Sequence, residues 1–265
     1  MSQPTLGIRE NIANIKSSQI KEFVEANFVG ENIVVSTCGK VDHDQIAASV
    51  TKAFSGLKAS ANVVLPNSEQ ARFTPSVMFM RDDEMANVNI GVFFKAPTWK
   101  DPEFFAMHLF RELLGDYRVD ENYAHINSLS RQYNTLHNEL GRYPDVNIHN
   151  TFYFPYSDTA LFGSYLHGNE VFGSQMYLVS QLVFTQYAAK IESQEIFRSK
   201  NRIYNHLLNN NSTATLAQDA SKQITYLGRA IPRSEFAHRI SLLSNHHLQR
   251  IIKEHFYDRV PSIPL

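Results

Sequence analysis

The sequence predicts an α+β fold in which helices pack on one face of a largely antiparallel sheet, with a first domain that is incomplete. Segments with alternating apolar side chains are followed by segments with apolar side chains at helical spacing, an order typical of α+β layers. Only one clear strand is expected before residue 60, and one strand cannot form a sheet alone. We therefore expect the first domain to borrow strands from elsewhere.

Composition agrees with a folded chain. The chain has 265 residues, of which 43% are apolar and 19% are charged, enough for a core and unlike a disordered protein. The formal net charge of −1 gives no reason to expect nucleic acid or anionic lipid as a partner. No apolar stretch reaches the roughly 20 residues of a membrane helix, so no transmembrane segment is expected. No cleavable targeting segment is visible at the start.

The first helix–strand–helix unit is expected within residues 1–60. Ser18 is the expected cap of a helix that Gly30 ends, and residues 33–35 read as a short buried strand. Asp42 followed by Gln45 resembles a capping box and begins a second helix.

Domain boundaries follow from a change in composition. Residues 61–75 are rich in small and polar side chains, contain Pro66 and Pro75 and lack periodicity, which is typical of a linker. We therefore expect a first domain at residues 1–60 and a second at 76–265.

The second domain begins with strands and continues with helices. Strands are predicted at residues 77–81, 88–94, 146–153 and 160–167, where apolar side chains alternate. Asp101 is the expected cap of a helix that Gly115 ends. The other predicted helices cover residues 122–140, 171–190, 193–209, 213–227, 233–243 and 246–257, with Pro232 and Gly228 as helix-boundary residues.

A search for a metal site finds no complete set of ligands. A catalytic zinc needs three protein ligands and an open position, yet neither His-Glu-x-x-His nor His-x-x-Glu-His occurs. The nearest segment is Ile251–His255, where isoleucine stands at the first ligand position and should face the core. His246 and His247 are adjacent on a helix and should point in different directions. Cys38 is the only cysteine, and its apolar neighbours predict a buried side chain.

For the other polar groups we favour a structural role over catalysis or cation binding. His43 follows a helix-capping aspartate and is a weak candidate for catalysis, while His125 and His137 are expected on the surface. Asp82–Glu84 either binds a cation or forms a solvated turn, and we favour the turn.

Two further segments are candidate binding elements. The basic residues Arg198, Lys200 and Arg202 are spaced for surface ion pairs with Glu192 and Glu195, not for phosphate recognition. The aromatic run at residues 152–156 could stack a base or a sugar, but packing against a neighbour is favoured.

Short motifs along nearly the whole chain resemble one known family in their order. The chain resembles the pitrilysin-type inverzincins, which include the mitochondrial processing peptidase and the core proteins of ubiquinol–cytochrome c reductase (respiratory complex III), and is most similar to the peptidase β type. The motifs are Thr5-Leu6-Gly7 with Glu10-Asn11-Ile12, Asn32-Ile33-Val34-Val35, Gly39-Lys40-Val41-Asp42-His43, Arg81-Asp82-Asp83, Pro97-Thr98-Trp99 with Asp101-Pro102, Leu114-Gly115-Asp116-Tyr117, Tyr156-Ser157-Asp158-Thr159-Ala160-Leu161-Phe162-Gly163, Arg198-Ser199-Lys200-Asn201, Ser221-Lys222-Gln223-Ile224, Gly228-Arg229-Ala230-Ile231-Pro232 and Arg239-Ile240.

The resemblance implies two related α+β domains, with the zinc ligands in the first half of the first domain. The present chain resembles the C-terminal portion, after those ligands, so no catalytic, cofactor-binding or metal-binding residue is assigned and no cofactor is expected in this chain. Zinc is possible in a partner chain. The chain is therefore not expected to be an enzyme on its own.

Three functions are kept as expectations from the resemblance. The first is a non-catalytic core (scaffold) subunit of complex III at the matrix face of the mitochondrial inner membrane, a split subunit paired with a chain carrying the N-terminal half, a second α-type core subunit and other complex III subunits. The second is the zinc-free half of an active presequence peptidase that another chain completes. The third is a scaffold in another mitochondrial complex or a truncated gene product.

Overall fold

The computed structural model describes residues 6–59, 71–80, 82, 84–119, 134–143, 146–169, 173–209 and 212–264. The chain divides into two units: unit 1 comprises Met1–Glu69 with Ser212–Thr225, and unit 2 comprises Gln70–Asn211 with Tyr226–Leu265. The domain boundaries expected at residues 60 and 75 stay a prediction.

A four-stranded antiparallel sheet forms the centre of unit 2. Its order is β2 (Asn87–Lys95), β5 (Ala160–Asn169), β4 (Val146–Pro155) and β3 (Tyr117–Arg118). Alternating side chains of β2 are buried, because one face of this strand lies under the helices. The predicted antiparallel α+β fold is confirmed, and only the short β3 was not expected.

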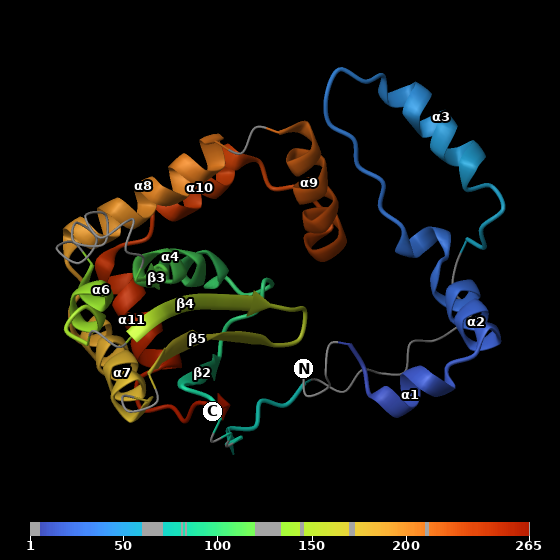
Figure 1. Cartoon of the computed structure of the whole chain (residues 1–265). Coiled ribbons are helices and arrows are strands. Elements are labelled where there is room, and N and C mark those ends of the chain that lie inside the picture. The colour runs from blue at the N-terminus through green and yellow to red at the C-terminus, as the bar shows by residue number, and fades with distance from the viewer. Residues whose placement is uncertain are drawn as a thin grey trace. The chain divides into compact units, whose positions relative to one another are not determined.

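Helices cover one face of this sheet (Figure 1). α4 (Phe104–Leu114) contacts β4, and α7 (Gly173–Ala189) contacts β2 and β5. α8 (Ser193–Asn209), α10 (Arg233–Ser241) and α11 (Asn245–His255) pack on these two helices, and α6 (Thr135–Leu140) packs on α7. The core between the layers is aromatic: Phe94, Phe110, Phe162, Phe184 and Phe256 lie with ring centroids 5.0–6.4 Å apart.

A second, two-stranded sheet joins distant parts of unit 2. β1 (Val77–Met78) pairs in parallel with β6 (Ile263–Pro264). Next to it, the main chains of Phe93 and Ser262 exchange two hydrogen bonds of 2.9 and 2.7 Å. The strand predicted at residues 77–81 is thus shorter than expected, and Arg81 lies outside the described residues.

Unit 1 consists of helices with little core. It contains α1 (Arg9–Asn14), α2 (Ser17–Asn27), the 3-10 turn η1 (Gly30–Asn32), α3 (His43–Ala53) and most of α9 (Thr213–Leu227). None of the described side chains in these elements is buried. The helices of this unit therefore keep apolar faces exposed.

The strand predicted at residues 33–35 is absent from the described residues, so this prediction is wrong. Ile33 is extended, with φ −110° and ψ 124°, but residues 33–38 pair with no other described segment. A strand is defined by a neighbour that completes its hydrogen bonds, and the described part of unit 1 supplies none. The hydroxyl of Ser36 instead donates to the main-chain oxygen of Ala217.

Several helix boundaries lie where the sequence predicts them. Asp42 caps α3, since its Oδ1 accepts from the main-chain N–H groups of Asp44 and Gln45 at 2.9 and 3.1 Å. Gly115 ends α4 at φ 66°, and Gly228 follows α9 at φ 71°, as predicted. Pro232 stands directly before α10.

Two predicted caps are corrected. Lys16 stands before α2 in place of Ser18, because the side chain of Gln19 accepts from the main-chain N–H of Lys16 at 2.9 Å. Asp101 does not cap α4: its Oδ2 accepts from the main-chain N–H and the hydroxyl of Thr98 at 2.6 and 2.9 Å, which stabilises the turn before the helix.

The other predicted helices are present, with boundaries shifted by a few residues. Of the helix predicted at residues 122–140, α6 covers the end, and residues 122–133 lie outside the described part. Among the described residues, no helix combines the length and the apolar character needed to cross a membrane.

Candidate functional site

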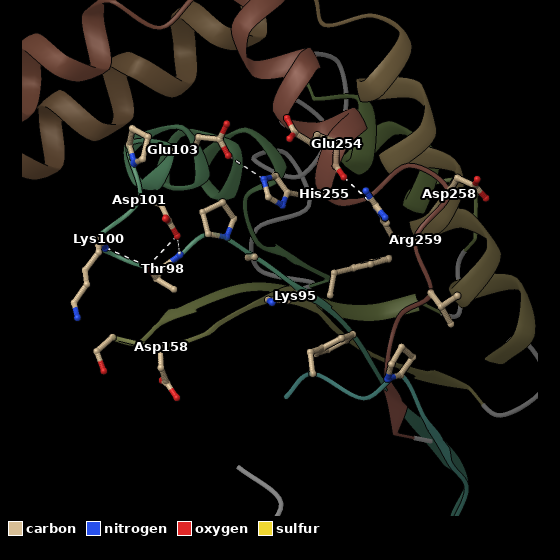
Figure 2. A pocket seen from close by; sticks show the side chains of 18 residues that line it. Lys95, Thr98, Lys100, Asp101, Glu103, Asp158, Glu254, His255, Asp258 and Arg259 are labelled. Carbon is tan, nitrogen blue, oxygen red and sulfur yellow. Dashed lines mark hydrogen bonds and ion pairs between the residues drawn. The ribbon is translucent and has the colours of Figure 1, made fainter. Parts of the chain in front are cut away.

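A charged cavity of about 1040 Å³ lies in unit 2 (Figure 2). It is formed by the end of β2, the loop before α4, the turn between β4 and β5, and the segment around the end of α11. Its charged lining residues are three cations, five carboxylates and one histidine: Lys95, Lys100, Arg259, Asp101, Glu103, Asp158, Glu254, Asp258 and His255. The lining therefore carries more carboxylates than cations.

The loop before α4 is held in place by the sheet. The main-chain N–H of Ala96 donates to the oxygen of Ala160 at 3.0 Å, which continues the pairing of β2 with β5. The hydroxyl of Tyr153 donates to the oxygen of Pro97 at 2.7 Å, and burial raises the pKa of this phenol well above its usual range. Tyr153 therefore stays protonated and keeps donating to the loop.

Ion pairs join the start of α4 to α11 on one side of the cavity. His255 Nε2 lies 2.9 Å from Glu103 Oε2, and Arg250 lies 3.4 Å from the other oxygen of the same carboxylate. Arg250 also reaches Glu254 at 3.2 Å. The main-chain oxygen of Glu254 accepts from Nε of Arg259 at 3.1 Å, which attaches the C-terminal segment. These groups are partly exposed, so each pair stabilises only modestly.

Several charged groups of the cavity remain available for a partner. Lys95, Lys100 and Asp258 form no ion pair with any described residue, and Asp258 has a left-handed backbone at φ 57°. One oxygen of Asp158 accepts from the main-chain N–H of Ala71 at 3.1 Å. The cavity thus presents cations and carboxylates to solvent.

The pair His255–Glu103 resembles two members of a hydrolytic triad, in which a carboxylate orients a histidine. A triad also needs a hydroxyl or thiol bonded to the second ring nitrogen. Within the described residues, His255 forms no such bond, and no group of three or more His, Cys, Asp or Glu could hold a metal ion. The charged groups of this arrangement are suited to contacts with a charged partner.

The segment with the nearest metal motif forms part of this cavity wall. Ile251 and Ile252 are fully buried, as predicted, while Glu254 and His255 line the cavity. His246 and His247 are exposed on α11, and His43 is exposed at the start of α3. The prediction that this chain has no catalytic, cofactor-binding or metal-binding residue stays a prediction.

Two burial predictions are wrong. Cys38 is exposed, because residues 33–38 form no strand in the described part that would place its side chain in a core. His137 is buried in α6, where its ring contacts Tyr117 at 5.5 Å, and is not a surface residue. His125 lies outside the described residues.

The ion pairs expected for Lys200 and Arg202 of α8 are also wrong. Glu195 is buried and accepts hydrogen bonds from Thr135 and Tyr187. Lys200 donates to the main-chain oxygens of Ser241 and Leu243 at 2.9 and 2.6 Å, and Glu192 pairs with Lys190. The short sequence separation suggested partners along one helix, whereas the fold supplies partners from other helices.

The remaining candidates have structural roles. Asp82 accepts from the main-chain N–H of Glu84 at 3.1 Å, which forms the expected turn, and Asp83 lies outside the described residues. In the aromatic run, Phe152 stacks on Phe154, and Tyr153 contacts Phe162. These contacts agree with the interpretation we favour, in which the aromatic run packs against neighbouring side chains.

Sequence reasoning missed the most connected residue of the cavity, Glu103. Its partner Arg250 lies 147 residues away, and no local pattern signals that pairing.

The fold and this cavity define a class: an α+β domain with a helix-covered antiparallel sheet and a charged cavity suited to binding. The chain belongs to the peptidase M16 family, since residues 14–202 match the family described as Peptidase M16 inactive domain. The family resemblance predicted from the motifs is confirmed.

Similar proteins include two mitochondrial types. A probable mitochondrial-processing peptidase subunit beta of Arabidopsis thaliana is 24% identical over 263 residues, covering 98% of this chain and 48% of that protein. Cytochrome b-c1 complex subunit 1 of Bos taurus is 23% identical over 268 residues, covering 99% of this chain and 54% of that protein. The chain thus spans about half the length of the curated relatives it matches.

A solved structure shares the fold. A chain of complex III2 from Candida albicans, with Inz-5 bound, superposes with a TM-score of 0.83 at 20% identity, over 99% of this chain and 61% of that chain. At this identity the likeness shows the fold alone.

Proposed function

We propose that this chain is part of a non-catalytic core subunit of mitochondrial respiratory complex III, where it acts as a scaffold at the matrix face of the inner membrane. The observation that carries the proposal is the match of residues 14–202 to the inactive domain of the M16 family. The similarity to cytochrome b-c1 complex subunit 1 and the fold shared with a complex III chain support it.

The proposal includes three kinds of partner: a chain that carries the zinc-binding half, a second core-like subunit of the α type, and other complex III subunits. Exposed apolar side chains in unit 1 support the first, because large exposed apolar faces mark interaction sites. Phe23 and Phe28 of the α2 region are 63% and 57% exposed. The extended residues 33–38 also leave main-chain groups open for pairing with a strand.

The test is purification of the tagged chain from mitochondrial membranes, with mass spectrometry of what co-purifies and a haem spectrum. Co-purification of cytochrome b and c-type subunits, with a haem spectrum in proportion to the chain, is the expected result. Recovery with soluble partners alone, and without haem, would overturn the scaffold proposal and favour another mitochondrial complex.

A second candidate is the zinc-free half of a split presequence peptidase, and the relatives named mitochondrial-processing peptidase subunit beta favour it. In this candidate the partner chain would hold zinc, which would supply a Lewis acid and an activated water for peptide hydrolysis. The present chain supplies only walls and contacts to the peptide.

The two candidates are separated by assaying the purified assembly for cleavage of a presequence peptide, with and without a chelator. Chelator-sensitive cleavage, together with a His-x-x-Glu-His motif in a co-purified chain, supports the peptidase. An assembly that carries haem but cleaves nothing supports the scaffold alone.

A further inference from the structure

A second cavity, of about 530 Å³, lies between α4, α8, α10 and β4. It shares no lining residue with the charged cavity described above. Its polar side is formed by residues of α4 and α8, and its apolar side includes Leu207 and Phe236. Ligand pockets commonly have volumes of about 300–1,000 Å³ and combine apolar walls with a few polar groups.

One of the two arginines at this cavity is neutralised by neighbours. Arg111 Nη1 lies 2.6 Å from Glu112, and its Nη2 lies 3.4 Å from Asp116. Its Nε donates to the main-chain oxygen of Thr151 at 3.3 Å. These contacts use three of the five N–H groups of Arg111, and the two carboxylates offset its charge.

The charge of the second arginine, Arg202, is not offset by a neighbouring carboxylate. Arg202 donates from Nη2 to the main-chain oxygen of Glu112 and, at 3.4 Å, to the hydroxyl of Ser199. No carboxylate of the described residues lies within ion-pair distance of Arg202, and its Nε and Nη1 bond to no described atom. His206 lies four residues further along α8, and side chains at this spacing share one helix face. The Arg202 guanidinium and the His206 imidazole thus lie along one edge of the cavity.

His108 contributes a neutral imidazole. Burial, and then the charge of Arg111, lower the pKa of His108 to about 4, so the ring is neutral near pH 7. The ring lies edge-on to Phe104 at 4.6 Å and to Tyr153 at 5.3 Å, which fixes its orientation. Its nitrogens bond to no described atom. One ring N–H is therefore free to donate to a ligand.

We propose that this cavity binds a small organic oxyanion, a carboxylate or a phosphate ester, that carries an apolar body. The oxyanion lies against Arg202 and His206, where a guanidinium offers paired donors suited to both groups. The apolar body lies along Leu207 and Phe236. This inference is independent of the proposed scaffold role, because it rests on side chains of unit 2 alone.

Isothermal titration calorimetry tests this proposal by measuring the affinity of the purified full chain for three probes. The probes have the same alkyl chain length and are octanoate, octyl phosphate and octylamine. We expect binding of at least one anion and no binding of octylamine. The tighter of the two anions identifies the headgroup class. Failure of both anions to bind, or equal binding of octylamine, would overturn the proposal.

Variants locate the binding. Arg202→Gln should weaken binding of the anion about tenfold, the effect of one charge-assisted contact, and His206→Gln should weaken it less. Arg142→Gln is the matched control, because Arg142 is an exposed arginine that pairs with Glu139 away from this cavity. Equal affinity of the wild type and Arg202→Gln for the anion would contradict the role of Arg202. Acetate, which lacks the apolar body, should bind more weakly than octanoate, because it cannot contact Leu207 and Phe236.

Discussion

At the scale of single residues, the buried carboxylate of Glu195 accepts three hydrogen bonds from described residues. Its Oε1 accepts from the main-chain N–H and hydroxyl of Thr135 at 2.7 and 3.0 Å, and from the hydroxyl of Tyr187 at 3.1 Å. Thr135 is the first residue of α6, so the carboxylate also lies near the positive end of that helix. One side chain therefore connects the starts of α6 and α8 with the end of α7.

Glu195→Ala should lower the free energy of unfolding by about 2–4 kcal/mol, because one buried donor of Tyr187 and two part-buried donors of Thr135 lose their acceptor. Glu195→Gln keeps one acceptor oxygen and should lose less. Urea unfolding, followed by circular dichroism, measures the difference. Glu192→Ala, at an exposed position three residues earlier, is the control and should change stability by less than about 0.5 kcal/mol. An equal loss in both variants would refute the role of Glu195.

His149 gives the fold a pH dependence. Burial, and then the neighbouring His137, lower the pKa of His149 to about 3, against about 6.5 in the unfolded chain. Between these values the unfolded chain binds more protons than the folded chain, so stability is full above about pH 6.5 and falls as the pH falls. Between pH 7 and pH 5 this residue alone should remove about 2 kcal/mol.

Urea unfolding of wild type and His149→Gln at pH 7 and pH 5 measures this effect. The variant should lose less stability on acidification than wild type, whatever its stability at pH 7. His246→Gln, which removes an exposed histidine of α11, is the control for the loss of a titrating group. The same acid-induced loss in wild type and His149→Gln would count against the assignment.

Single residues could be predicted where their partners are close in sequence. Asp42 was identified as a cap because its partners Asp44 and Gln45 follow directly. Glu195 was assigned to the surface because its partner Thr135 lies 60 residues away, and spacing along one helix cannot indicate that contact.

At the scale of elements, the contact between β2 and β5 depends on Gly163. A Cβ atom built on Gly163 would lie 2.0 Å from the main-chain oxygen of Val92 and 2.8 Å from Cα of Phe93. Both obstacles are backbone atoms, so they cannot rotate away. β2 and β5 therefore approach each other at a distance that only glycine permits.

Gly163→Ala should destabilise unit 2 by more than about 3 kcal/mol, since strand pairing itself must shift. Gly228→Ala is the comparison: its φ of 71° strains an alanine, but no atom lies within 4 Å of the added Cβ. It should lose only about 1 kcal/mol. Thermal unfolding of both variants compares their losses of stability. A smaller loss for Gly163→Ala than for Gly228→Ala would contradict the close approach of β2 and β5.

Elements were predictable where periodicity and packing agree. β2, β4 and β5 alternate because one face of each is buried, and the alternation is visible in the sequence. Residues 33–35 are a continuous apolar run, yet they form no strand in the described part, because a strand needs a pairing neighbour that the run itself does not reveal. The two-residue strands β3 and β6 are too short to show a period.

At the scale of the whole molecule, the two units differ in how much they bury. The described helices of unit 1 have no buried side chain, whereas α4 alone buries seven residues in unit 2. Local stability follows buried apolar contact. The α+β fold class was predictable from the sequence because unit 2, the larger unit, contains the antiparallel sheet and the helices that cover it.

Hydrogen exchange of the isolated chain should therefore show fast exchange in α2 and α3 and slow exchange in β4 and β5. Mass spectrometry of peptides from each element measures the difference. In the assembly of the proposed function, α2 should gain protection while β4, already protected, stays unchanged. Equal protection of α2 and β4 in the isolated chain would show that unit 1 is stable without a partner.

The division of the chain between the units also bears on synthesis. Unit 1 contains Ser212–Thr225 beside the N-terminal residues, so its last segment leaves the ribosome long after its first. The strands β2, β4 and β5 are all available once Asn169 has been made. Domains usually fold from the N-terminus during translation. In this chain the central sheet of unit 2 can form before unit 1 is complete, because Ser212–Thr225 is synthesised after Asn169.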